Sequence, residues 1–118
     1  MIKLEALADA LAFYHKAYDP ISQAYKTRNP GLLPATMLKH TRDGEGKRTF
    51  TSFLDGYQAL LFDLKIKCSG RSAVRHPLIT LNDLVQNKAA GKYLARFLTH
   101  ALNETITGET LLSHFLGE

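Results

Sequence analysis

The chain has 118 residues, which is the length of one ordinary domain. Its 45% hydrophobic and 22% charged residues exclude an intrinsically disordered chain and predict one compact core. The 15 Lys and Arg outnumber the 11 Asp and Glu, and the resulting net charge of +4 permits an anionic partner without requiring one.

The cellular location has to be inferred from cysteine usage and from apolar runs. A single cysteine, Cys68, excludes an internal disulfide and gives no sign of an oxidising compartment. The start of the chain lacks the basic region and the continuous apolar run of a signal peptide. No apolar run approaches the roughly 20 residues that span a bilayer. We therefore expect a cytoplasmic location by default and no membrane partner.

The first predicted element is a helix over residues 3–17. Apolar residues recur there at helical spacing, at Leu4, Leu7, Ala8, Leu11 and Tyr14. The Asp19-Pro20 pair is expected to end this helix, because the residue before a proline avoids helical backbone angles.

Residues 18–48 are rich in proline and glycine instead of showing helical periodicity. The Asn29-Pro30-Gly31 sequence is a strong turn signal, and residues 42–47 are typical of a loop or a hairpin tip. Short strands are predicted on either side of that tip, near 36–40 and 47–51. The region therefore predicts a small β-hairpin or an irregular lobe between the first two helices.

The next helix is predicted to begin after Ser52 and to end near Cys68. The Ser52 hydroxyl is placed to cap the free amides of the first turn, with Asp55 three residues on as in a capping box. Gly70 follows as a stop signal, because glycine readily adopts the left-handed conformation that ends many helices.

Three shorter signals follow in the last third of the chain. Thr80 and Asp83 form another capping pair, which predicts a short helix from Leu81. A longer helix is predicted over 89–102, and Thr107 is expected to cap a last short helix that ends near Leu116. In the longer helix, the residues expected to face inward are Tyr93, Leu94, Phe97, Leu98, Ala101 and Leu102.

Side chains with possible catalytic or metal chemistry are few and scattered. The histidines are His15, His40, His76, His100 and His114. None has a second histidine four residues away, the spacing typical of a zinc site on a helix, so we expect no metal and no other cofactor. Cys68 lies on the apolar stripe of its helix, which favours a small core residue over a nucleophile.

A basic stretch covers residues 65–76. Such a run is typical of a solvated surface, although it is also able to contact phosphates. No zinc finger, RNA-recognition signature or helix-turn-helix accompanies it, so nucleic acid is kept only as a minor alternative partner.

Three segments together carry a family pattern: residues 29–33 (Asn-Pro-Gly-Leu-Leu), residues 50–60 (Phe-Thr-Ser-Phe-Leu-Asp-Gly-Tyr-Gln-Ala-Leu) and residues 68–72 (Cys-Ser-Gly-Arg-Ser), followed by Thr80-Leu81 and Asp83-Leu84. In order and spacing they resemble small lysozyme-like domains of phages and bacteria. Members have an Asn-Pro-Gly-Asn-Leu turn and then a Phe-x-Thr/Ser-x-x-Asp/Glu-Gly helix start. The resemblance covers residues 10–85 and implies a mainly α, lysozyme-like helical domain over the single domain 1–118.

The departures from the family pattern concern its catalytic residue. Members of the family carry a Glu-Gly pair at the end of the first helix, and that Glu is the general acid. A gapless alignment from Asn29 places His15 and Lys16 at these positions. The second Asn of the turn is replaced by Leu32. An imidazolium offers a proton but, unlike a carboxylate, opposes the positive charge that develops on the sugar, so the resemblance predicts weak or absent hydrolysis.

The first hypothesis is therefore a catalytically degenerate lysozyme-like module that binds peptidoglycan, another glycan or a protein, in a virion or released with phage. Its cleft is expected between the end of the first helix and residues 29–50, lined by His15, Tyr18, Asn29 and Asp55. Asn29 and Asp55 are expected to hold backbone more than to touch ligand.

Two alternatives stay open. The first is an active muramidase or lytic transglycosylase that uses another acid, such as Asp19. The second is a small basic phage-encoded protein that binds a macromolecule, as an inhibitor or a nucleic-acid binder.

Overall fold

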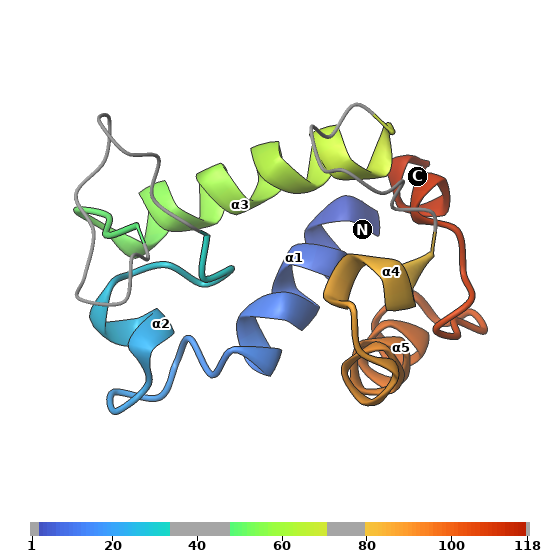
Figure 1. The fold of residues 1–118 in the computed structure, drawn as a ribbon, viewed down its shortest axis with the longest axis horizontal. Helices are drawn as coiled ribbons and strands as arrows, with labels where there is room; N and C mark the ends of the chain where they lie inside the picture. Colours follow the sequence, from blue (N-terminus) through green and yellow to red (C-terminus); the bar gives the residue numbers. More distant parts are fainter. Residues whose placement is uncertain (1–2, 34–47, 71–79, 118) are drawn as a thin grey trace. The chain divides into compact units, whose positions relative to one another are not determined.

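The computed structural model describes residues 3–33, 48–70 and 80–117, which are mainly helical (Figure 1). The elements are α1 (Lys3–Tyr14), α2 (Gln23–Lys26), α3 (Phe53–Cys68), α4 (Leu81–Val85), α5 (Lys88–Leu102) and a 3-10 helix, η1 (Leu112–Leu116). These residues contain no β-strand; Thr80 and Leu111 form an isolated antiparallel bridge, and Arg48 is also a bridge residue. The mainly α class is confirmed. The predicted strand at 36–40 and the predicted hairpin tip at 42–47 lie outside the described residues, and the described part of the second predicted strand, 48–51, forms no strand.

The chain forms two compact units. One combines Met1–Ala10 with Leu61–Glu118 and is called the terminal unit here, and the other, Leu11–Leu60, is called the inner unit. Helices α1 and α3 each contribute residues to both units, because each helix crosses a unit boundary in the sequence.

Helix α1 ends at Tyr14, earlier than the expected residue 17. Lys16 has a positive φ of 58°. The Ala17 N–H donates to the Ala12 carbonyl (2.9 Å) and the Lys16 N–H to the Phe13 carbonyl (3.0 Å). This pair of bonds is a Schellman motif, which closes a helix with one left-handed residue, usually glycine. The sequence prediction relied on Asp19-Pro20 and missed this earlier stop.

The core of the inner unit is built from small residues. Ala12, Ala17 and Ala24 form a buried cluster, against which Leu32 and Phe53 pack. Alanine side chains let backbone segments approach closely, so this short stretch buries apolar surface without long helices.

Helix α3 begins as the sequence predicts. The Asp55 N–H donates to the Ser52 hydroxyl (3.1 Å), and the helix runs to Cys68. Gly70 follows with a positive φ of 76°, the conformation expected of a C-terminal stop.

Helix α4 and the last helix test two further capping predictions. The Thr80 hydroxyl accepts the Asp83 N–H (3.3 Å) and the Asp83 carboxylate accepts the Thr80 N–H (2.9 Å), which is the predicted capping box. Thr107 does not cap η1, because its hydroxyl accepts the Glu109 N–H (3.2 Å) inside a separate turn. The predicted cap at Thr107 is therefore wrong, and η1 begins at Leu112.

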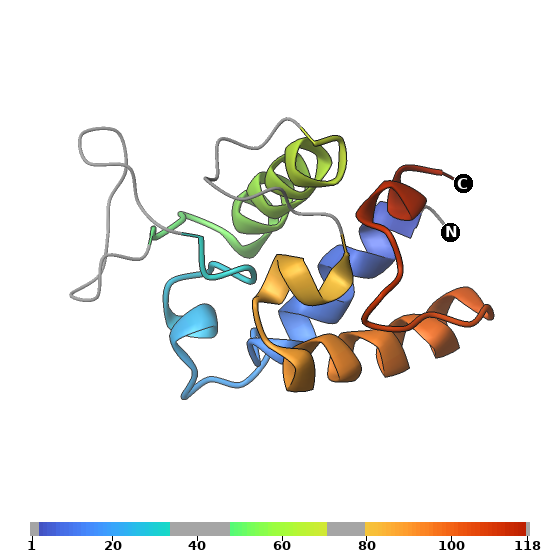
Figure 2. The ribbon, with the colours of Figure 1, turned by 45° about the vertical axis from the view of Figure 1, so that its right-hand side comes forward.

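The terminal unit packs α4 against α5, as both ribbon views show (Figures 1 and 2). The leucines of α5 that face inward are Leu94 and Leu98, as predicted, whereas Tyr93 is 46% exposed and Ala101 is also exposed. The fully buried side chains of this unit include Leu7, Leu64, Leu81, Leu94, Leu98, Leu112 and Phe115.

The terminal unit also brings the two ends of the chain together, with the start of α1 beside η1 (Figure 2). The Glu104 carboxylate lies 2.7 Å from His114 Nε2 and 3.6 Å from Lys3 Nζ. The hydrogen bond with His114, and then the charge of Lys3, lower the pKa of Glu104 below its ordinary value.

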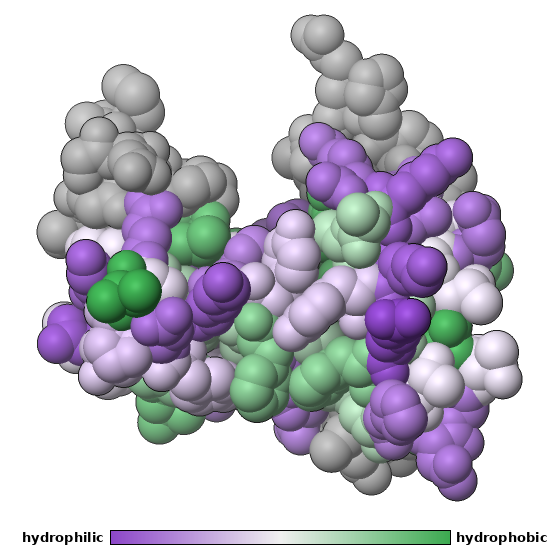
Figure 3. All heavy atoms as spheres, turned by 90° about the horizontal axis from the view of Figure 1, so that it is seen from below, coloured by the Kyte–Doolittle hydropathy of each residue, from purple (hydrophilic) through white to green (hydrophobic). Residues whose placement is uncertain are grey.

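Apolar side chains also reach the surface. Ile21, Leu54 and Phe62 are more than half exposed, and on the face shown in Figure 3 apolar residues lie among hydrophilic ones. No helix of the described residues combines the length and apolar character needed to cross a membrane.

Candidate functional site

The Asn-Pro-Gly turn of the inner unit is organised by Asn29, whose side chain is fully buried. Its amide Nδ2 donates to the carbonyls of Leu33 (2.9 Å) and Arg48 (2.8 Å), and its Oδ1 accepts the Leu33 N–H (2.9 Å). Both donors and the acceptor of the amide are therefore used by backbone. Asn29 holds the residue 29–33 turn against the segment at Arg48 and has no hydrogen left to offer a ligand.

Leu32 occupies a strained position in the same turn. Its φ is 47°, and its N–H donates to the Asn29 carbonyl (3.0 Å). A positive φ is uncommon for a branched apolar residue and several-fold commoner for asparagine. The turn therefore takes a shape at Leu32 that asparagine or glycine would adopt more easily.

Asp55 lies at the start of α3 with its side chain exposed. Its carboxylate accepts the Thr51 hydroxyl (2.8 Å), while its own N–H is capped by Ser52. Both of these Asp55 bonds thus fasten the first turn of the helix.

His15 and Asp19 flank the left-handed residue that ends α1. The His15 N–H donates to the Leu11 carbonyl (2.9 Å), and its partly exposed ring makes an edge contact with Tyr14 at 5.2 Å between ring centroids. The Asp19 carboxylate accepts the Ile21 N–H (3.1 Å), so it closes an exposed turn.

Four aromatic rings follow one another across the inner unit, and we call them the aromatic row. The ring centroids are 5.1 Å apart from Phe13 to Tyr18, 5.4 Å from Tyr18 to Phe53, and 6.2 Å from Phe53 to Tyr57. These are ordinary distances for favourable aromatic pairs. Phe13 is 48% and Tyr18 52% exposed, while Phe53 and Tyr57 are partly buried.

The sequence prediction named only Tyr18 from this row. The i, i+4 spacing of Phe53 and Tyr57 on α3 was a usable signal that these two rings share a helix face. Their meeting with Phe13 and Tyr18 depends on the turn that follows α1, and no local pattern contained it.

Partly exposed aromatic rings suit ligands that present a flat apolar face beside polar groups. Pyranose rings do so, because their C–H bonds cluster on one face and their hydroxyls point outward. Aromatic residues combine a large apolar area with, in tyrosine, a hydroxyl for hydrogen bonding.

Two further kinds of reactive group are a nucleophilic thiol and a cluster of metal ligands. Cys68 is 4% exposed, and burial, with a smaller contribution from Asp63, raises the pKa of its thiol to about 11. The thiol is therefore protonated at neutral pH and a poor nucleophile. No group of three or more His, Cys, Asp or Glu is placed to hold a metal among residues 3–33, 48–70 and 80–117.

The basic stretch at 65–76 is described only up to residue 70. Lys65 is exposed, and Lys67 forms an ion pair with Asp63 four residues earlier (2.7 Å). Residues 71–76 lie outside the described ranges, so this prediction stays open.

Compared with family models, with curated proteins and with solved structures, the chain has no match. Any function assigned to it therefore depends on the geometry of its own residues.

Proposed function

We propose that the chain is a lysozyme-like domain that has lost its general acid and binds a glycan through the aromatic row. One observation carries the proposal: two residues that depart from the family pattern both have positive φ. Lys16 (φ 58°) stands where the family has glycine, and Leu32 (φ 47°) stands where it has asparagine. These are the residue types that adopt this conformation most readily.

The coincidence supports the register of the alignment. A shift of one residue along α1 would pair the family glycine with His15 or Ala17, and neither has a positive φ in the structure. The same register pairs the family's catalytic Glu with His15. A local misalignment that hides a glutamate at this position is therefore disfavoured.

His15 is a weak substitute for that acid. Glycoside hydrolysis needs a group that protonates the leaving oxygen and then stabilises the positive charge on the sugar. A carboxylic acid becomes negative as it gives up its proton, whereas an imidazolium only becomes neutral. We therefore expect the chain to bind glycan but to hydrolyse it weakly or not at all.

The proposed ligand is a glycan strand of the peptidoglycan type. Phe13 and Tyr18 offer exposed ring area for sugar C–H faces. Asn29 and Asp55 are assigned to the scaffold, since their polar groups hold backbone and the start of α3.

Glycan binding is tested with soluble peptidoglycan fragments and N-acetylglucosamine oligomers, by calorimetry and by tyrosine fluorescence. Tyr18→Ala should weaken binding by about tenfold, because it removes the central exposed ring of the row. Tyr25→Ala is the matched control, since Tyr25 is also in the inner unit and 48% exposed but outside the row. Equal losses in both variants, or no binding by the wild type, would overturn the proposal.

Hydrolysis is tested separately, by release of reducing ends from peptidoglycan between pH 4 and 8. The wild type should be silent, and His15→Glu should gain activity if the rest of the family site is present. Cleavage by the wild type that disappears in Asp19→Asn would instead establish the alternative in which Asp19 is the acid.

A further inference from the structure

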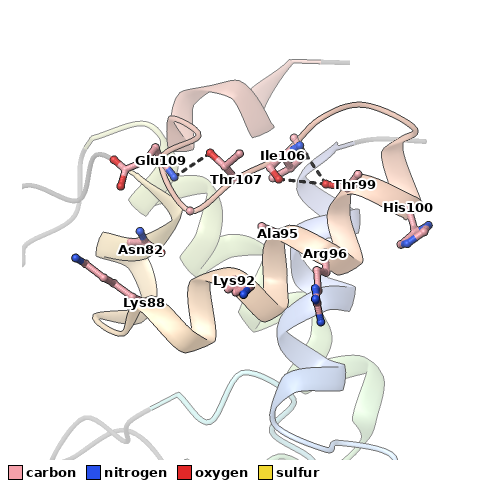
Figure 4. A pocket seen from close by; sticks show the side chains of 11 residues that line it. Asn82, Lys88, Lys92, Ala95, Arg96, Thr99, His100, Ile106, Thr107 and Glu109 are labelled. Atoms are coloured by element: carbon pink, nitrogen blue, oxygen red, sulfur yellow. Dashed lines mark hydrogen bonds between the residues drawn. The ribbon is translucent and has the colours of Figure 1, made fainter.

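A second surface feature lies on the terminal unit and includes no residue of the aromatic row. A groove of about 400 Å³ is bounded by α5 and by the segment 106–109 (Figure 4). Its lining includes Lys88, Lys92, Arg96, Ala95, Ile106 and Glu109.

One wall of the groove is a cationic stripe. Lys88, Lys92, Arg96 and His100 follow one another at four-residue spacing on α5, and all are exposed. Residues four apart lie on one helix face, and the whole stripe rises about 18 Å along the axis. No described residue forms an ion pair with Lys88, Lys92 or Arg96.

The floor of the groove is apolar, and a polar group of the opposite wall is hydrogen-bonded within the protein. Ala95 and Ile106 are buried at the floor. The Thr99 hydroxyl donates to the Ile106 carbonyl and accepts the Ile106 N–H, both at 3.1 Å, so it fixes the wall. Glu109 supplies the single carboxylate of the lining and its side chain is exposed.

We propose that this groove binds a single strand of nucleic acid. Phosphates contact Lys88, Lys92 and Arg96 along the stripe, and bases lie over the apolar floor at Ala95 and Ile106. The proposal is independent of glycan binding by the inner unit, because it uses none of the same residues.

The linear arrangement of the cations favours a single nucleic-acid strand over other anions. A small phosphate compound is best held by cations that converge on one point, whereas these cations form a line. A duplex receives a helix that protrudes into its major groove, whereas the stripe on α5 borders a hollow. A polyanionic strand whose phosphates follow the line of cations while its bases enter the hollow beside them fits both features.

The test is fluorescence anisotropy with labelled single-stranded DNA of about 12 nucleotides, titrated at several salt concentrations. Three phosphate contacts predict a slope of about −2 for log K against log salt, which is about a 20-fold loss of affinity between 50 and 200 mM. Lys92→Gln/Arg96→Gln should bind about tenfold more weakly at 50 mM salt, and its loss over the same range should fall to about threefold.

Two further variants separate a groove effect from general charge or misfolding. Lys16→Gln/Lys26→Gln removes the same charge from exposed sites outside both the groove and the basic stretch, and should keep the wild-type slope. Glu109→Gln should bind about two- to threefold more tightly, a gain that a damaged fold does not produce.

The proposal is overturned if the wild type does not bind at 50 mM salt, or if the control pair weakens binding as much as the groove pair. It is also overturned if a matched duplex or a poly-glutamate peptide competes as well as the single strand. Preferential loss in the groove pair, together with the gain in Glu109→Gln, supports it.

Discussion

At the scale of single residues, two residues of the inner unit have a left-handed backbone conformation that glycine or asparagine adopts more readily. The left-handed conformation costs an L-residue about 1 to 2 kcal/mol of free energy relative to the right-handed one, whereas it costs glycine almost nothing. Lys16 and Leu32 both carry this cost. The turns at 16 and 32 persist because the surrounding hydrogen bonds and packing outweigh it.

Lys16→Gly is therefore expected to stabilise the protein. The free energy of unfolding should rise by about 0.5 to 1 kcal/mol, less than the full strain because glycine also gains freedom in the unfolded chain. Urea unfolding measures the change. Lys26→Gly is the control, since Lys26 is helical and glycine there should lower stability. A loss of stability in Lys16→Gly would contradict the assignment of a left-handed helix stop.

Asn29→Ala should have the opposite effect, by about 3 kcal/mol. It removes three hydrogen bonds from a fully buried site and leaves the Leu33 N–H and the Arg48 carbonyl without their partner. Thermal and denaturant unfolding both report the loss. A change below about 1 kcal/mol would mean that water replaces the amide and that the turn does not depend on Asn29.

At the scale of elements, the contact between α3 and the residue 28–30 turn requires a glycine. A Cβ on Gly56 would overlap the Arg28 carbonyl oxygen and crowd the Pro30 ring. Backbone atoms cannot move aside as a flexible side chain does, so Gly56→Ala should lower the free energy of unfolding by about 2 kcal/mol despite the better helix propensity of alanine. Gln58→Ala, at an exposed site of the same helix, should be nearly neutral. Equal effects would show that the close approach is absent.

The elements also show which parts of the fold the sequence could predict. The starts of α3 and α4 were correct, because a hydroxyl and a carboxylate three residues apart specify a capping arrangement locally. The end of α1 was wrong, because Lys16 is an unusual residue for a left-handed stop and only the surrounding bonds impose it. The predicted helix cap at Thr107 was wrong because its hydroxyl accepts the N–H of Glu109, two residues on, in a local turn.

The candidate sites likewise combine features that follow from local sequence with features that depend on the packing of distant segments. The backbone role of Asn29 follows from a local turn signal, whereas the aromatic row joins residues up to 44 positions apart in the chain. The cationic stripe was predictable from the four-residue spacing of basic residues on α5, but the sequence prediction considered only the dense basic run at 65–76. Its opposing wall at 106–109 comes from a separate segment, and only packing brings it near.

At the scale of the whole molecule, Cys68 should make stability depend on alkaline pH. Its thiol has a pKa of about 11 in the folded protein, against 9.0 as the ordinary value. The unfolded chain releases the proton first, so stability is complete below pH 9 and falls as the pH rises toward 11, by about 2 to 3 kcal/mol. The difference in unfolding free energy between wild type and Cys68→Ala, measured from pH 7 to 11, isolates this thiol. A difference that does not change with pH would contradict the raised pKa.

The division of the chain between its two units determines when each unit can fold during synthesis. The inner unit is continuous in sequence, so all of its residues have been synthesised when residue 60 is added. The terminal unit needs Lys3 to meet Glu104 and His114, which are synthesised on the order of seconds later. Until then, the part of α1 that belongs to the terminal unit lacks the later residues of that unit. This first part of the helix is thus accessible to chaperones and to neighbouring nascent chains during that interval.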